Sequence, residues 1–136
     1  MAAQENGGGY ADLIREAQSA RDSAYAPYSR FSVGAALKTK SGAVYRGCNV
    51  ENISFGLTIC AERVCVGAAI VSNDHDFEVI AIVSDSGDPV VPCGACRQVL
   101  AEFSPGMTIV TANLSGAVSK FNLNELLPRP SQGILG

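Results

Sequence analysis

The chain has 136 residues, the size of one ordinary domain, and its 47% hydrophobic and 17% charged residues are typical of a folded globular protein. Its net charge of −3 and its scattered basic residues argue against a nucleic-acid partner, which favours a basic patch, and leave a small molecule as the expected ligand. No apolar stretch approaches the roughly 20 residues of a membrane span, and the polar start lacks the features of a secretion signal.

We therefore expect a cytoplasmic protein without a membrane partner. A single domain over residues 10–128 is expected between a flexible N-terminal tail (1–9) and a C-terminal tail (129–136). Hydrophobic periodicity and turn residues predict the order of elements. In chain order these are a helix over 10–24, strands over 31–38 and 44–50, a helix over 60–71, a strand over 79–83, a helix over 92–103, strands over 107–112 and 118–121, and a short helix over 122–127.

Three of these elements carry additional signals. The helix over 60–71 is almost wholly apolar, so we expect it to be buried, and the run from Val79 to Val83 is typical of a strand covered on both faces. Asn122 and Glu125 resemble a capping box at the start of the last helix. A buried strand between helices predicts an α/β fold: a three-layer α/β/α sandwich around a mixed sheet of about five strands.

Two of the five cysteines form a Cys-x-x-Cys pair at the start of a predicted helix. Cys93 and Cys96 are three residues apart, so both sulfurs lie on nearly the same helix face and can bind one ion. Such a pair fits a zinc site or a redox site. The redox alternative is the weaker one, because the pair comes late in the chain and follows a proline.

Cys60 begins the other apolar helix, so three sulfurs converge if the two helices pack side by side. Helix N-termini also favour thiolates. Cys65 lies about 140° around the helix from Cys60, at about 100° per residue, and cannot easily share the ion. Cys48 is less easily excluded, although both are best interpreted as small buried apolar residues. Three protein ligands leave one position for water, which is the mark of a catalytic zinc.

Glu62 and Arg63 follow Cys60 directly. Burying a glutamate in an apolar helix is costly, so beside a zinc site we interpret Glu62 as the proton-transferring group. Its alternative is a glutamate that pairs with Arg63 or is exposed in the first turn of the helix. Three thiolates and Zn²⁺ sum to one negative charge, which weakens the pull of the metal on its water. Arg63 is the candidate for offsetting that charge behind the ligands; its alternative is an ordinary surface arginine.

Taken together, several segments make the sequence resemble the small homotetrameric cytidine deaminases. The zinc-deaminase pattern of a metal-binding Cys-x-Glu followed by Pro-Cys-x-x-Cys, with a glutamate that is no ligand, is present here. The matching segments are Tyr25-Ala-Pro-Tyr-Ser-Arg-Phe-Ser-Val-Gly-Ala-Ala-Leu, Gly47-Cys-Asn-Val-Glu-Asn, Cys60-Ala-Glu-Arg, Pro92-Cys-Gly-Ala-Cys-Arg-Gln-Val and Glu125-Leu-Leu-Pro.

The resemblance implies roles for residues that no spacing argument identifies. Asn49 and Glu51 match the pair that hydrogen-bonds the ribose hydroxyls, with a turn-capping pair as the alternative. Phe31 matches the aromatic residue against the pyrimidine, with core packing as its alternative, and Ala61 matches a backbone contact to the base. Phe55 stands where the family often has a tyrosine at a subunit contact.

One departure concerns the C-terminus. The family commonly places a phenylalanine one or two residues after Leu-Leu-Pro, and here Arg129, Pro130 and Ser131 follow instead. The resemblance therefore implies hydrolytic deamination of cytidine and deoxycytidine with one Zn²⁺ per chain and a zinc-activated water, in a homotetramer, while the altered tail keeps a blasticidin-type or modified nucleoside substrate open. Two further alternatives are a nucleic-acid editing deaminase, disfavoured by acidity and length, and a non-catalytic zinc-stabilised binding module.

Overall fold

A computed structural model describes residues 8–131 of the chain. Residues 1–7 and 132–136 of the two predicted tails lie outside this range. A five-stranded sheet forms the centre, with strand order β2-β1-β3-β4-β5. β3 and β4 run parallel and every other neighbouring pair runs antiparallel. The predicted α/β class with a mixed sheet of five strands is confirmed.

The elements follow the predicted order with shifted ends. They are the 3₁₀ turn η1 (Gly8–Tyr10), α2 (Ala11–Arg21), β1 (Val33–Thr39), β2 (Val44–Cys48), the 3₁₀ turn η2 (Phe55–Leu57), α3 (Ala61–Val71), β3 (Phe77–Ser84), α4 (Gly94–Phe103), β4 (Thr108–Asn113), β5 (Val118–Asn122) and α5 (Leu123–Leu126). The first helix ends at Arg21, three residues early, and β3 extends beyond the predicted strand at both ends. The capping box at Asn122 and Glu125 is present, with both reciprocal bonds formed.

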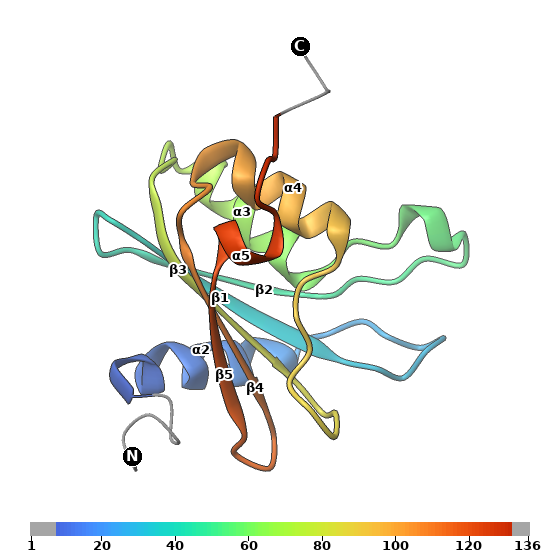
Figure 1. Cartoon of the computed structure of the whole chain (residues 1–136). Helices are drawn as coiled ribbons and strands as arrows, with labels where there is room; N and C mark the ends of the chain where they lie inside the picture. Colours follow the sequence, from blue (N-terminus) through green and yellow to red (C-terminus); the bar gives the residue numbers. More distant parts are fainter. Residues whose placement is uncertain (1–7, 132–136) are drawn as a thin grey trace.

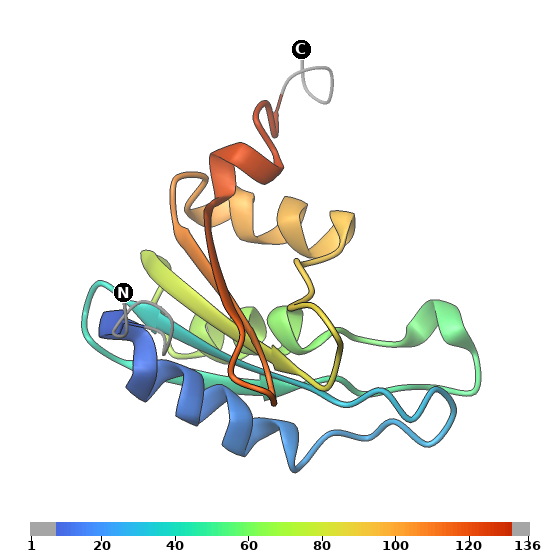
Figure 2. The ribbon, with the colours of Figure 1, turned by 60° about the horizontal axis from the view of Figure 1, so that its bottom comes forward.

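The sheet separates two layers of helix, as Figures 1 and 2 show: α2 covers one face, and α3 and α4 cover the other. Alternate residues of a strand point to opposite faces, and the core divides accordingly. On β3, Ile80 and Ile82 pack beneath α3 and α4, whereas Ala81 and Val83 pack beneath α2. β3 is therefore buried on both faces, as its apolar run predicts.

One expectation about α3 is wrong in part. Its Ala61, Cys65 and Ala69 are fully buried, but Val71 at its end is 83% exposed. The sheet covers only one face of the helix, even though nearly all the residues of the helix are apolar. Among residues 8–131, no helix is long and apolar enough to cross a membrane.

Two glycines allow helices to approach the sheet closely. A Cβ at Gly34 would lie 2.0 Å from the carbonyl oxygen of Ala17 on α2. A Cβ at Gly47 would lie 2.5 Å from the carbonyl oxygen of Ala61 and 2.9 Å from the sulfur of Cys65. Gly47 therefore sets how near the first turn of α3, which follows Cys60, can lie to β2.

Candidate functional site

Three cysteines meet where α3 and α4 begin. Cys60 and Cys93 are the N-cap residues of the two helices, and Cys96 lies in the first turn of α4. The Cys60 and Cys93 sulfurs are 3.9 Å apart, the Cys93 and Cys96 sulfurs are 3.5 Å apart, and all three lie within 4.8 Å of one another. Cys93 is exposed, Cys60 is half-buried and Cys96 is buried, so the cluster opens to one side.

The donor set fits a zinc ion. Three sulfurs of a tetrahedral zinc site, each about 2.3 Å from the metal, lie roughly 3.8 Å from one another, close to the measured separations. Neither N-cap cysteine accepts a capping bond from its own helix, so both sulfurs remain free for an ion. In the described part of the chain, Cys48 and Cys65 do not join the cluster. Cys65 is buried, as expected of a small packing residue, whereas Cys48 is only partly buried.

The Cys60 and Cys96 sulfurs shift each other's pKa in opposite directions. A hydrogen bond from Cys96 and the nearby Arg63 guanidinium lower the pKa of Cys60 to about 5, against the opposing effect of burial. The Cys60 thiolate in turn raises the pKa of Cys96 above its usual range, together with burial. A divalent cation removes this competition, because it stabilises each coordinated thiolate.

Arg63 approaches the cluster from within α3. Its guanidinium Nη2 lies 3.5 Å from the Cys60 sulfur, and hydrogen bonds with the Cys60 and Cys96 sulfurs raise the pKa of Arg63 above its usual range. Its Nε is buried and has no hydrogen-bond partner within residues 8–131. Arg63 therefore lies directly against the Cys60 sulfur and is not an ordinary surface arginine.

Glu62 is buried beside the cluster, with only 6% of its surface exposed. Desolvation, together with the nearby Cys60 sulfur, raises the pKa of its carboxyl group to about 7 against the opposing effects of a backbone hydrogen bond and of Arg63. The described residues include no salt bridge to Glu62. The alternative of an ordinary Glu62–Arg63 ion pair is therefore not what this structure contains.

Asn49 and Glu51 lie just beyond β2, next to the cysteine cluster in the fold. Val50 between them pairs with Ile59 through two 2.9 Å backbone bonds, and Ile59 directly precedes Cys60. Alternation along an extended segment directs the side chains of residues 49 and 51 to the same side. Both are buried, each 8% exposed, as expected for polar groups with a defined partner.

The two side chains organise the loop that precedes β1. The Asn49 amide donates to the Phe31 carbonyl at 2.8 Å and accepts from the Val33 N–H at 2.9 Å. A Glu51 oxygen accepts from the N–H groups of Tyr28 and Ser29, at 3.0 and 3.1 Å. These bonds lower the pKa of Glu51, the Ser29 hydroxyl contributing most, against the opposing effect of burial. The pair thus holds a turn in this structure, and both side chains retain further hydrogen-bonding capacity.

Phe31, Phe55 and Ala61 have contrasting environments. Phe31 is 38% exposed, so it is not a plain core residue, and Phe55 is 69% exposed and lies nearly perpendicular to the Tyr28 ring. Ala61 is fully buried as the first residue of α3. Figures 1 and 2 show that the loop before β1 and the segment between β2 and α3 project from the same side of the molecule.

Sequence reasoning gave no role to Ser29, Arg97 or Gln98, although all three lie in the segments that carry the resemblance. Ser29 donates to Glu51 and its hydroxyl accepts from the Phe31 N–H at 3.0 Å, so it links two predicted ligand-binding residues. Arg97 and Gln98 hydrogen-bond to backbone carbonyls on either side of α4. For Arg97 and Gln98, the sequence feature that could have indicated a role is their position directly after Cys96.

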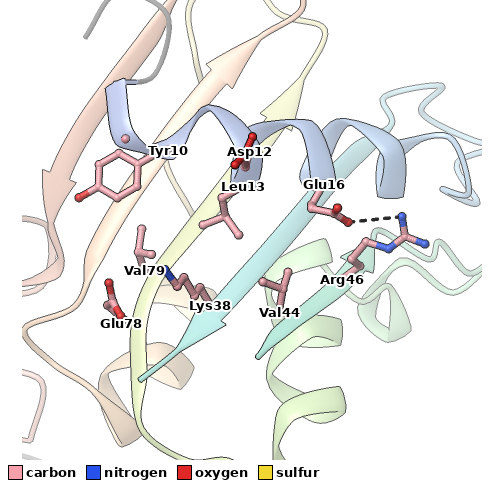
Figure 3. A pocket seen from close by; sticks show the side chains of 10 residues that line it. Tyr10, Asp12, Leu13, Glu16, Lys38, Val44, Arg46, Glu78 and Val79 are labelled. Carbon is pink, nitrogen blue, oxygen red and sulfur yellow. Dashed lines mark ion pairs between the residues drawn. The ribbon is translucent and has the colours of Figure 1, made fainter. Parts of the chain in front are cut away.

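The groove in Figure 3 is a separate feature. It encloses about 510 Å³ between α2 and strands β1 to β3, and its lining mixes apolar Leu13 and Val44 with charged Glu16, Lys38 and Arg46. Glu16 and Arg46 pair across it at 3.8 Å. Because α2 covers the face of the sheet opposite α3 and α4, this groove is not part of the cysteine site.

Comparisons with known proteins agree with this site. Residues 10–112 match the model of the cytidine and deoxycytidylate deaminase zinc-binding region. The cytidine deaminase of Halalkalibacterium halodurans is 52% identical over 117 residues, which cover 85% of this chain and 89% of that protein. The blasticidin-S deaminase of Bacillus cereus is 32% identical over 108 residues, 74% of this chain and 76% of that protein.

A solved structure extends the likeness to three dimensions. The crystal structure of cytidine deaminase from Burkholderia pseudomallei superposes with a TM-score of 0.85 at 46% identity, covering 88% of this chain and 96% of that one. The predicted deaminase-like fold is thereby confirmed. The matched range of the family model includes all three clustered cysteines and Glu62.

Proposed function

The chain belongs to the cytidine and deoxycytidylate deaminase family, and on this premise we propose that it hydrolyses free cytidine and deoxycytidine to uridine and deoxyuridine with release of ammonia. The observation that carries the proposal is a buried carboxyl group, Glu62, beside a cluster of three sulfurs that opens to one side. A zinc site that served only to stabilise a binding module would need a fourth protein ligand, and it would have no use for that carboxyl group.

Cys60, Cys93 and Cys96 hold one zinc ion per chain. When bound, zinc acts as a Lewis acid that makes water a good nucleophile near neutral pH. Arg63 offsets the excess negative charge of the three thiolates from its position against Cys60. Because the Cys93 side of the cluster is exposed, water and substrate have a route to the remaining ligand position.

Glu62 moves the protons. It takes the proton that the attacking water gives up and passes it to ring N3 of the pyrimidine. After water oxygen bonds to C4, Glu62 carries the second proton to the amino group, which leaves as ammonia while C4 becomes a carbonyl. A group that must both accept and donate is most effective when its pKa is near the working pH, and burial of Glu62 acts in that direction.

The loop of residues 25–33, together with Asn49 and Glu51, binds the nucleoside. Asn49 and Glu51 contact the ribose hydroxyls with the donor and acceptor positions that their bonds to the loop leave over. Phe31 lies against the pyrimidine, and the backbone at Ala61 contacts the base. What supports these roles is that hydrogen bonds already fix both polar side chains, so little order is lost when the sugar binds.

We further propose a cytoplasmic homotetramer with one catalytic domain over residues 10–128. Ile53, Phe55 and Leu57 are 82%, 69% and 66% exposed on the projecting segment beside Asn49 and Glu51. Exposed apolar groups that lie together mark association surfaces, and a neighbouring chain seated there would close the site. None of the five cysteines, all of which lie within residues 8–131, forms a disulfide in this structure, which suits a reducing compartment.

The test is the loss of ultraviolet absorbance when zinc-loaded protein is added to cytidine. Glu62→Gln should reduce kcat by about 10²- to 10⁴-fold with zinc content unchanged. Glu102→Gln, an exposed carboxylate on α4, is the matched control and should keep full activity. Absence of turnover by the parent protein with one zinc per chain would remove the cytidine assignment.

Two observations favour blasticidin S as a second substrate. One is the similarity to blasticidin-S deaminase, and the other is that no aromatic residue follows Leu-Leu-Pro. Blasticidin S and deoxycytidine belong in the same assay as cytidine. We expect the highest kcat/KM for the two cytosine nucleosides, because the 52% identical relative is a cytidine deaminase. A higher kcat/KM for blasticidin S would reverse that order without changing the chemistry assigned to Glu62.

A further inference from the structure

Two neighbouring side chains of α4, Arg97 and Gln98, have no role in the reaction described above. Arg97 Nε donates to the Pro92 carbonyl at 2.8 Å, and its Nη1 donates to the Leu126 carbonyl at 3.2 Å. Gln98 Nε2 donates to the Pro130 carbonyl at 3.0 Å. Two adjacent residues thus hold three carbonyls, one from the loop before α4 and two from the end of the chain.

The first of these carbonyls belongs to the residue that directly precedes a metal ligand. Pro92 is buried and comes immediately before Cys93, the exposed sulfur of the cluster and the N-cap of α4. A proline has no N–H, so its carbonyl is the only backbone hydrogen-bonding group by which it can be held. The Arg97 bond to that carbonyl therefore fixes the backbone from which the Cys93 sulfur projects.

The other two carbonyls belong to the segment after β5. α5 is anchored by its capping box, and Leu126 and Leu127 pack against the core under α3 and α4. Beyond them, the Gln98 bond holds the chain at Pro130. Figure 1 shows α5 beside α4, with the chain leading away from it. One guanidinium thus joins the C-terminal segment to the loop that carries Cys93.

We propose that Arg97 and Gln98 are positioning residues that brace the Cys93 loop with the C-terminal segment Leu126–Pro130, so that this segment slows loss of zinc from the site. Arg97 makes charge-assisted bonds in two directions, and such bonds are stronger than neutral ones. Groups behind metal ligands commonly change metal affinity by about 10- to 100-fold. The inference rests on the zinc assignment of the proposed function, but not on the identity of the substrate.

The test measures zinc transfer from the full-length holoprotein to a chromophoric chelator. Arg97→Met keeps the length of the side chain and removes its donors; we expect release about tenfold faster. Gln98→Leu, which removes one neutral bond, should accelerate release by about twofold to fivefold. Arg15→Met is the matched control, since Arg15 lies on α2 across the sheet, where it pairs with Asp12.

The proposal is overturned if both variants release zinc at the same rate as Arg15→Met. The same holds if a variant unfolds at a lower temperature but still releases zinc at that rate. If Arg97→Met does not fold, Gln98→Leu alone decides. If the parent protein deaminates cytidine and both variants release zinc at the control rate, this inference is wrong and the proposed function stands. If both variants release zinc faster but the parent protein does not deaminate cytidine, this inference stands and the proposed function is wrong.

A second measurement uses the reciprocity of coupled equilibria. If the C-terminal segment stabilises the zinc site, bound zinc must stabilise the segment. Removing zinc from the parent protein should therefore speed hydrogen exchange at the amides of Leu127, Arg129 and Ser131, while amides of α2 on the opposite face of the sheet stay unchanged. Equal exchange in the zinc-bound and zinc-free forms would overturn the proposal.

Discussion

The two ends of the candidate site are built in different ways. The cysteine end, defined as Cys60, Cys93, Cys96, Glu62 and Arg63, stands on the first turns of two helices that pack on the sheet. The loop end, defined as residues 25–33 with Asn49 and Glu51, is held by hydrogen bonds between irregular segments, and its Arg30 has a left-handed φ of 60°.

The difference indicates a division of labour. At the cysteine end, buried side chains fix the backbone, so the ligand sulfurs are in place before any substrate arrives. At the loop end the order comes from a few polar contacts beside exposed aromatic rings. Segments with few buried apolar contacts open at lower free energy than core helices. We therefore expect substitutions at the first end to remove zinc or the fold, and those at the second end to weaken nucleoside binding.

The largest effect should come from removing a ligand. Cys96→Ala is expected to weaken zinc binding by more than about 100-fold, because changing a group behind a ligand alone costs 10- to 100-fold. Cys65→Ala is the matched control: Cys65 is equally buried but lies outside the cluster. It should keep one zinc per chain and lose about 1 kcal/mol of unfolding free energy. Zinc content and denaturant unfolding measure both.

Next is the packing of α3 on β2. Gly47→Ala forces a methyl group against the Ala61 carbonyl and the Cys65 sulfur. Overpacking of this kind costs about 1–3 kcal/mol of unfolding free energy, and it should also displace the turn that carries Glu62. Gly67→Ala, at an exposed and open position of α3, should stabilise by up to about 1 kcal/mol. Urea unfolding measures both changes in unfolding free energy. Changes of opposite sign in the two variants confirm the comparison, and changes of the same sign contradict it.

A smaller effect should follow at the loop end. Ser29→Ala removes a hydroxyl that donates to Glu51 and accepts from the Phe31 N–H. We expect kcat/KM for cytidine to fall by about tenfold, mainly through KM, since a bond to a charged group contributes about 1.5–3 kcal/mol. Zinc content should not change. Ser23→Ala, which removes an exposed hydroxyl, is the control, and a Ser29 effect on kcat alone would contradict the division between the two ends.

The smallest effect concerns pH. Hydrogen bonds from Ser29 and Tyr28 lower the pKa of Glu51 in the folded protein. Its contribution to stability is therefore complete above the unfolded carboxyl pKa of about 4.3 and is lost as the pH falls through the lowered folded value. Glu51→Gln should flatten this part of the acid-unfolding profile relative to the parent. An unchanged profile would show that the loop bonds do not depend on the carboxylate charge.

The sequence allowed the cysteine end to be predicted more completely than the loop end. Cys93, Cys96 and the pair Cys60 and Glu62 sit in short motifs whose spacing translates directly into helix geometry. The apolar run of β3 likewise indicated the central strand. Spacing could not show that Asn49 and Glu51 would bond to residues 28–33, because those contacts join segments about 16 to 23 residues apart through loops without periodicity.

The same reason explains the remaining differences. The end of α2 at Arg21 depends on where the chain must turn to enter β1, and the exposure of Val71 depends on which face of α3 the sheet covers. The link from Arg97 to Leu126 spans 29 residues and uses backbone carbonyls as acceptors. Any residue could supply such a carbonyl, so no residue type in the C-terminal segment marks the contact in advance.

The separation of the clustered cysteines along the chain has a consequence for synthesis. Cys60 precedes Cys93 by 33 residues, with β3 between them. At a translation rate of about 5–20 residues per second, Cys60 leaves the ribosome roughly 2–7 s before its first partner does. During that interval its thiol has no metal to share, so zinc capture is a late event on a nascent chain whose first half is already made.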